Sequence, residues 1–195
     1  MITIHCLVED TAKPDSGLRA EHGISWHIET PQGRVLFDTG ASGDVLLHNA
    51  ALLGVDLAQI DALVLSHAHY DHTGGLDAVL ACARPDLPLY ASPDLFRPRY
   101  KSSGDGETFI GITHTRADLA ARCELHLSAG PLEVLPGLWT TGDLVAATIG
   151  MASDVGLNDT VKVRHDRYGL EDGGLFRVVG VELDITERKH YEEAL

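Results

Sequence analysis

Positive charge is scarce in this sequence: 15 Lys and Arg residues stand against 29 Asp and Glu residues, giving a formal net charge of −14. Sequence-independent nucleic-acid binding and attachment to anionic membranes both need basic groups, so we expect neither partner. Long apolar runs are missing too, and no stretch approaches the ~20 residues of a membrane-spanning helix. The acidic charge says nothing more about the substrate.

Cysteine pairs are also absent. The three cysteines, Cys6, Cys82 and Cys123, are scattered and form no C-x-x-C motif, which argues against a disulfide framework and against a thiolate zinc site. The first eight residues lack the basic start and apolar run of a signal peptide. Together these features predict a cytoplasmic protein.

Histidine, by contrast, is plentiful, with 11 residues in a chain of 195. Histidine is the commonest metal ligand in proteins, so the composition alone points toward metal chemistry. Apolar residues make up 44% of the chain, which is enough to bury a sizeable core.

The first part of the chain alternates between expected strands and helices, which predicts an α/β layered architecture. Strands are expected at 2–8, 23–30, 34–37, 62–65, 87–91, 124–127, 132–135 and 138–141. Ser42, Ser92 and Thr115 are candidate helix N-caps, and a further helix is expected over 73–83, before Pro85. Residues 62–65 are wholly apolar, which is typical of a strand buried on both faces.

The decisive motif follows that buried strand: Ser66-His67-Ala68-His69-Tyr70-Asp71-His72-Thr73-Gly74-Gly75. Side chains two residues apart on an extended chain point to one side, so His67 and His69 can converge on one metal. Asp71 and His72 lie where the chain turns toward a helix, and they can face a second metal or the same one. Imidazole and carboxylate suit zinc, with iron or manganese as alternatives. The competing interpretation is a polar loop of solvated histidines.

The H-x-H-x-D-H motif, preceded by Val35-Leu36-Phe37-Asp38-Thr39-Gly40, resembles the metallo-β-lactamase fold superfamily. Residues 17–23, 66–76, 93–100 and 136–142 are similar to its branch containing the dihydropterin aminobenzene ribofuranosyl phosphate synthases. The resemblance covers residues 1 to about 143 and implies an αββα sandwich with a dinuclear metal site between its two sheets. It also implies either a hydrolase in which Asp71 aligns a metal-bound hydroxide, or an enzyme whose metal orients a phosphorylated substrate.

Four more residues are candidates around such a site. Asp38 follows a strand and is expected to orient a ligand histidine. His22 either lines the pocket or lies on a plain surface loop. Arg97 and Arg99 could hold an anionic substrate such as a phosphate, because the guanidinium fork matches phosphate geometry, or they could form exposed salt bridges.

The later ligands that the resemblance implies, a His, a bridging Asp and a final His, are not found in place. His114 could be recruited instead, whereas His126 alternates with leucines like an ordinary half-exposed strand residue, and His165 could contribute only if the tail folded back. Four donors can hold one zinc ion, so we expect one or two ions. An incomplete sandwich would expose a sheet edge, which favours a homodimer.

The C-terminal part has a different character. Residues 144–157 are rich in Ala, Gly and Ser and predict a linker between a domain at 1–143 and a segment at 158–195. That segment resembles the C-terminal end of PAS sensory domains, and it predicts a β-hairpin followed by a charged helix from about residue 184. An amphipathic hairpin and helix unrelated to PAS domains is the alternative.

Taken together, the sequence predicts an incomplete metallo-β-lactamase-like α/β domain joined to a PAS-like end. The expected function is that of a metal-dependent, hydrolase-like enzyme acting on a small molecule, with a phosphorylated compound as one class of substrate. The alternative is a non-catalytic metal-binding or signalling module, left by truncation and fusion.

Overall fold

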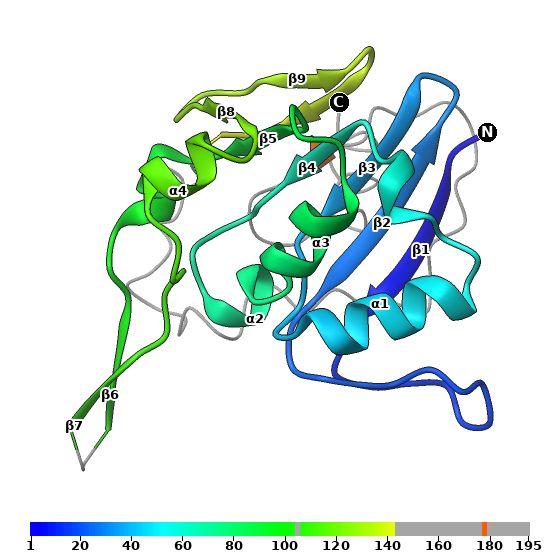
Figure 1. The fold of residues 1–195 in the computed structure, drawn as a ribbon, viewed down its shortest axis with the longest axis horizontal. Helices are drawn as coiled ribbons and strands as arrows, with labels where there is room; N and C mark the ends of the chain where they lie inside the picture. The colour runs from blue at the N-terminus through cyan, green and yellow to red at the C-terminus, as the bar shows by residue number, and fades with distance from the viewer. Residues whose placement is uncertain (104–105, 143–176, 179–195) are drawn as a thin grey trace, which may run out of the picture. The chain divides into compact units, whose positions relative to one another are not determined.

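The computed structural model describes residues 1–103, 106–142 and 177–178, and the chain divides into two compact units, Met1–Ser128 and Ala129–Leu195. The first unit holds a six-stranded sheet in the order β1-β2-β3-β4-β5-β8 (Figure 1). Its strands are β1 (Thr3–Val8), β2 (Ser25–Thr30), β3 (Gly33–Phe37), β4 (Ala62–Val64), β5 (Pro88–Ala91) and β8 (Glu124–Leu127). Neighbouring strands from β1 to β3 are antiparallel, and those from β3 onward are parallel. The predicted α/β class is thereby confirmed.

Helices α1 (Gly43–Leu52), α2 (Tyr70–Thr73), α3 (Leu76–Cys82) and α4 (Arg116–Ala120) connect these strands, together with 3-10 turns at Leu57–Gln59 and Pro93–Phe96. The three predicted N-caps are confirmed. The hydroxyls of Ser42 and Ser92 accept the N–H groups of Val45 and Asp94, at 3.3 and 3.0 Å. Thr115 forms a reciprocal capping box with Asp118.

The helix expected over 73–83 is α3, which begins later than predicted, at Leu76, because the separate helix α2 ends at Thr73 and Gly74-Gly75 form a corner between them. The amide of Gly74 donates to the carbonyl of Gly40 at 3.0 Å, and that of Gly75 donates to Thr39 Oγ1 at 3.2 Å. A Cβ on Gly74 would lie only 2.1 Å from the carbonyl oxygen of Ala41. The two glycines therefore let the α2–α3 corner pack directly on the loop after β3, and their amides are engaged within the protein.

Both faces of the sheet are apolar. On one face, the register pairs Leu36 with Leu63 and Leu63 with Leu89, and these leucines belong to a core shared with the helices. Figure 1 shows α1, α2 and α3 in front of the sheet. On the other face, Trp26 and Phe37 are buried and stack with ring centroids 5.7 Å apart. This agrees with the sheet buried on both sides that residues 62–65 predict.

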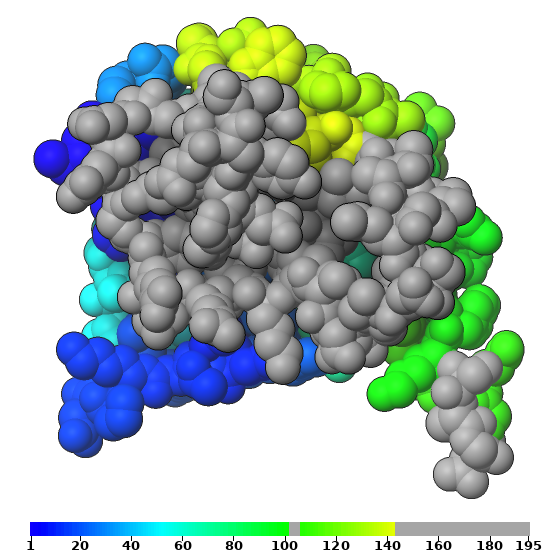
Figure 2. Space-filling model, turned by 180° about the vertical axis from the view of Figure 1, so that it is seen from behind, coloured from blue at the N-terminus to red at the C-terminus, as the bar shows by residue number. Residues whose placement is uncertain are grey.

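A hairpin that the sequence did not predict comes after β5. Strands β6 (Tyr100–Ser103) and β7 (Gly106–Phe109) form a separate antiparallel pair. In Figures 1 and 2 this hairpin projects, in green, on the opposite side of the first unit from the β1–β2 connection, in blue. Among the described residues, no helix is long and apolar enough to cross a membrane. All three cysteines are free.

The second unit contains a small sheet of β9 (Glu133–Leu135), β10 (Leu138–Thr140) and β11 (Arg177–Val178). Strands β9 and β10 are antiparallel, and β11 lies parallel to β10. The predicted linker at 144–157 lies outside the described residues, and so does the PAS-like segment apart from residues 177–178. The domain boundaries at 143 and 158 stay predictions.

A buried histidine in β2 provides a test of the fold. His27 is 1% exposed, its ring lies 5.8 Å from that of His5, and neither of its nitrogens has a hydrogen-bond partner within the described part of the chain. Burial lowers the pKa of His27, and the charges of His5 and Arg34 lower it further. The charge of Glu29 raises this pKa but does not outweigh burial. The folded protein therefore holds His27 neutral at a pH where the unfolded chain protonates it.

We expect this difference to make the protein less stable as the pH falls. Below the ordinary histidine pKa of about 6.5, His27 binds a proton in the unfolded state but not in the folded state. This difference lowers the free energy of unfolding by up to about 1.4 kcal/mol between pH 7.5 and 5.5. His27→Leu should remove that part of the slope in urea unfolding measured across this range. Ile28→Leu, the neighbouring buried position, should keep the full slope. Equal slopes for wild type and His27→Leu would contradict the assignment.

Candidate functional site

The H-x-H-x-D-H motif lies at the carboxyl ends of the adjacent parallel strands β3 and β4. Asp38 directly follows β3, and its amide donates to the carbonyl of Val64 in β4 at 2.9 Å. Ser66 and His67 leave the end of β4, and Asp71 lies in α2. Side chains from two neighbouring strand ends thus meet at one edge of the sheet, where α/β proteins commonly place their sites.

Asp38 is fully buried and fixed on every side. Its carboxylate accepts the Ser66 amide at 2.8 Å, the Ser66 hydroxyl at 2.6 Å, and lies 2.7 Å from Nδ1 of His72. The Ser25 hydroxyl donates to its carbonyl oxygen at 2.8 Å. Its φ of 54° is left-handed, a region that Asp tolerates better than most residues and that persists where the surroundings over-determine it. Asp38 thereby directs Nε2 of His72 away from itself, as expected of a carboxylate that orients a ligand.

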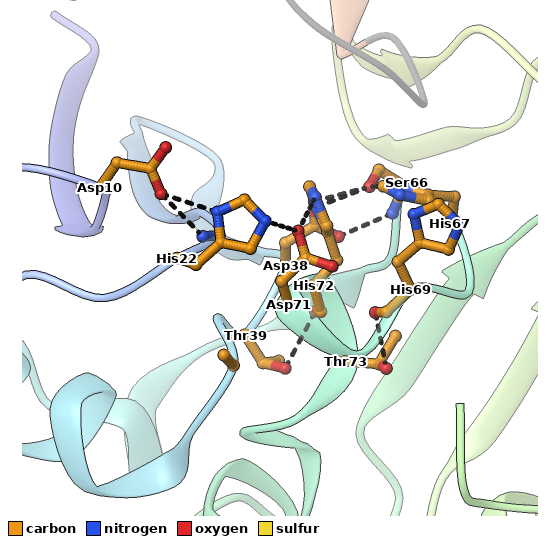
Figure 3. Close-up of polar contacts among 12 residues, drawn as sticks. Asp10, His22, Asp38, Thr39, Ser66, His67, His69, Asp71, His72 and Thr73 are labelled. Atoms are coloured by element: carbon orange, nitrogen blue, oxygen red, sulfur yellow. Dashed lines mark hydrogen bonds and ion pairs between the residues drawn. The ribbon is translucent and has the colours of Figure 1, made fainter. Parts of the chain in front are cut away.

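The three histidines of the motif pack together in Figure 3. The ring of His67 lies 4.1 Å from that of His72 and 4.5 Å from that of His69, between centroids. Nδ1 of His67 lies 2.9 Å from the Ser66 hydroxyl. Asp71 places its Oδ2 atom 3.4 Å from Nε2 of His72. The structure therefore brings all four residues of the motif into one cluster with Asp38.

Charge is distributed unevenly within this cluster. Burial lowers the pKa of His67 to about 3, helped by the charges of His72 and His69, and burial also lowers the pKa of His69. Burial would lower the pKa of His72 as well, but Asp38 and Asp71 outweigh it and raise that pKa to about 10. Burial would raise the pKa of Asp71, but the hydrogen bond and charge of His72 lower it to about 2. His67 and His69 are thus neutral imidazoles, the form that binds metals.

The other predicted candidates occupy different places. His22 joins the cluster, with its Nε2 3.4 Å from Oδ2 of Asp71. Arg99 pairs with Asp94, and its charge contributes to the lowered pKa values of His67 and His69. Arg97 is 73% exposed and lies 4.0 Å from Asp94, which matches the surface salt bridge that was its alternative. The structure favours Arg99 over Arg97 as a residue near the cluster.

The weaker ligand candidates have other partners. Nε2 of His114 lies 3.1 Å from Asp77 in α3, an oxygen that also accepts from Arg122 at 2.5 Å. His126 stacks on Tyr90 with ring centroids 4.7 Å apart. His165 lies outside the described residues. His114 therefore links α3 to the loop before α4.

Sequence reasoning missed Asp10 and the supporting role of Ser66. The hydroxyl and amide of Ser66 hold Asp38. Asp10 contacts His22, Nδ1 to Oδ1, at 3.0 Å. Nothing in the sequence around Asp10 marks it, because its role depends on a loop that returns to the site.

The donor set fits zinc in kind, since the neutral imidazoles of His67 and His69 and the Asp71 carboxylate are ligands that zinc prefers besides thiolates. His72, whose pKa is raised, would release a proton on binding a metal. The second nitrogen of His72 is bonded to a carboxylate, the usual outer partner of a ligand histidine. Across the residues that the structure describes, however, no group of three or more His, Cys, Asp or Glu side chains is arranged to hold an ion. His67, Asp71 and His72 have polar side-chain contacts, and His69 packs its ring against His67. The role of the four residues as ligands stays a prediction.

The chain is similar to known proteins of one superfamily. A family model described as the metallo-beta-lactamase superfamily matches residues 19–176. A 7,8-dihydropterin-6-methyl-4-(beta-D-ribofuranosyl)-aminobenzene-5'-phosphate synthase of Methanocaldococcus jannaschii is 31% identical over 151 residues, which cover 73% of this chain and 51% of that protein. A hydroxyacylglutathione hydrolase of Psychromonas ingrahamii is 32% identical over 93 residues, covering 46% of this chain and 35% of that one.

Among solved structures, a metal-dependent hydrolase of the beta-lactamase superfamily matches with a TM-score of 0.54 and 26% identity. The match covers 71% of this chain and 47% of that structure. The chain spans about half the length of the first curated relatives that it matches.

Proposed function

We propose a function from the family to which this chain belongs, the metallo-beta-lactamase superfamily. The chain is a metal-dependent, hydrolase-like enzyme, and its centre is the cluster of His67, His69, Asp71 and His72. One observation supports this most: Asp38, wholly buried, holds His72 on one nitrogen while the other faces Asp71 beside two neutral imidazoles. A buried carboxylate is costly unless it is paired and hydrogen-bonded, and the Asp38 carboxylate is bonded to His72 of the motif and to Ser66 beside it.

Roles follow from these contacts. His67 and His69 would hold a first metal ion, and Asp71 and His72 would hold a second, with zinc as the expected ion and iron or manganese as alternatives. When bound, such an ion supplies Lewis acidity toward a substrate oxygen. Asp38 fixes the orientation of His72, and Ser66 fixes Asp38. Asp71 would align the attacking group, because its carboxylate is held by its neighbours.

The proposed substrate is a small molecule with an anionic group. Arg99 is the cation whose charge reaches His67 and His69, and it stands out in a chain of net charge −14. Nη2 of Arg99 pairs with Asp94, and its Nη1 donates to the carbonyl of Arg97 at 3.3 Å. The five N–H groups of a guanidinium leave further donors that could bind a phosphate. The matched synthase has a phosphate in its name, which supports a phosphorylated compound as one candidate class.

A turnover screen tests the enzyme proposal. We expect zinc-loaded protein to hydrolyse at least one of bis(4-nitrophenyl) phosphate, a homoserine lactone and a glutathione thioester, with loss of activity after chelation. His69→Ala should abolish that turnover, whereas Arg84→Gln, which removes an exposed arginine beside Asp86, should retain it. Tight metal binding with no turnover on any substrate would favour the alternative, a non-catalytic metal-binding or signalling module. A homodimer and a PAS-like end remain further proposals.

A further inference from the structure

His22 lies between two carboxylates that come from separate parts of the chain. Its Nδ1 is 3.0 Å from Oδ1 of Asp10, in the loop after β1, and its Nε2 is 3.4 Å from Oδ2 of Asp71, in α2. Figure 3 shows the ring bridging the two. Both nitrogens of this exposed ring thus face carboxylates, which distinguishes His22 from a surface histidine without side-chain partners.

The loop that presents His22 is anchored on its neighbour Glu21. The Glu21 carboxylate accepts the amides of Ala41 and Ser42 at 3.0 and 2.9 Å, and the Ser42 hydroxyl at 2.6 Å. These groups belong to the N-cap of α1, Ser42, and the residue before it, where unpaired amides favour a carboxylate. Glu21 therefore fixes the residue before His22 to a helix of the main core.

A second anchor lies three residues upstream of His22. The buried Asn49 side chain accepts the amide of Arg19 at 2.9 Å and donates to the carbonyls of Arg19 and Leu7, at 2.8 and 2.7 Å. All of its hydrogen-bonding groups are engaged, and it joins the loop to β1. With Glu21 and Asn49 holding the backbone, the position of His22 is determined by the fold.

Asp71 is consequently flanked by two similar arms, each of which is a histidine held by a second carboxylate. On the inner side, Asp38 holds His72, whose Nε2 lies 3.4 Å from Oδ2 of Asp71. On the outer side, Asp10 holds His22, whose Nε2 lies at the same distance from the same oxygen. The inner arm is buried, while the outer arm is largely exposed. One carboxylate oxygen is therefore fixed from two directions.

We propose that His22, braced by Asp10, is a positioning residue that holds the Asp71 carboxylate in the orientation needed for metal binding. This inference rests on the proposed function, because it concerns the same site. An exposed ion pair adds little to stability. The effect of His22 is therefore expected in metal affinity, with the thermal unfolding of the apo protein almost unchanged.

Zinc affinity of the full chain, measured by competition with a chromophoric chelator, tests this proposal. We expect His22→Ala to weaken zinc binding by about 10-fold, the lower end of the range for residues that support a ligand. His22→Gln, which keeps a donor within reach of Asp71, should recover part of that loss. Asp10→Asn should weaken binding less, and adding it to His22→Ala should change nothing further, because Asp10 acts through His22. His126→Ala, a half-exposed histidine beside Glu124, is the matched control and should bind like wild type.

The outcomes separate this inference from the proposed function. Wild-type affinity in His22→Ala, with an unchanged visible spectrum of the cobalt-substituted protein, would overturn the positioning role and leave the metal site standing. Failure of the wild-type chain to bind zinc would overturn both. A lower unfolding temperature of apo His22→Ala, with zinc affinity as weak in His22→Gln as in His22→Ala, would show a merely structural role and also reject the proposal.

Discussion

Replacing Asp38 by alanine is expected to lower the free energy of unfolding by about 3–5 kcal/mol, the usual cost of removing one partner from a buried charged pair. His72 would lose the carboxylate 2.7 Å from its Nδ1, and the Ser66 amide and hydroxyl would lose their acceptor. All of these groups lie where water cannot readily replace the lost partner. Urea unfolding of wild type and variant measures the difference.

Two controls separate charge from backbone conformation at this position. Asp38→Asn keeps a residue that tolerates the left-handed φ of 54° while removing the charge, so its loss should be smaller, about 2 kcal/mol. Asp86→Ala removes an exposed acid 3.9 Å from Arg84 and should cost less than about 0.5 kcal/mol. A loss below about 1 kcal/mol for Asp38→Ala would show that the Asp38 network contributes little to folding.

Gly23→Ala is expected to be the second severe substitution, with a loss of about 3 kcal/mol or more. A Cβ at this position would lie 1.9 Å from the backbone carbonyl oxygen of Asp71, and the φ of Gly23 is 115°. Since the obstacle is backbone, no side-chain rotation can relieve the overlap. Either the loop with His22 or the start of α2 must move.

Gly54→Ala is the matched control, because Gly54 also has a positive φ, of 71°, but a Cβ there would meet nothing within 4 Å. Its loss should be about 1 kcal/mol, from backbone conformation alone. The excess loss in Gly23→Ala, measured by urea unfolding, is the cost of the overlap with Asp71. Equal losses in the two variants would contradict the close approach of the loop to α2.

Much of the first unit could be predicted because its signals are local. An N-cap such as Ser42 or Thr115 depends on hydrogen bonds within a few residues of itself. The buried strand at 62–65 is visible from its apolar run, and the histidine cluster from four donors within six residues. Residues so close in sequence must lie near one another whichever fold surrounds them.

What could not be predicted depends on distant segments meeting. The break at Gly74 arises from its packing against residues after β3, and a helical pattern in sequence does not report that. The β6–β7 hairpin has little alternation of apolar and polar residues, so no strand period marks it. The contact of Asp10 with His22 forms only when the loop after β1 folds back toward α2. In each case tertiary packing determines the local structure, and the propensities of the local residues do not predict it.

Metal content is the most direct test of the account, because every proposed role depends on the His67–His72 cluster holding an ion. The protein would be loaded with zinc, separated from free metal and analysed by mass spectrometry for zinc per chain, beside His67→Ala. We predict at least one zinc per wild-type chain and a clear loss in His67→Ala while its fold is retained by circular dichroism. Less than one zinc per wild-type chain, or equal content in His67→Ala, would contradict the account.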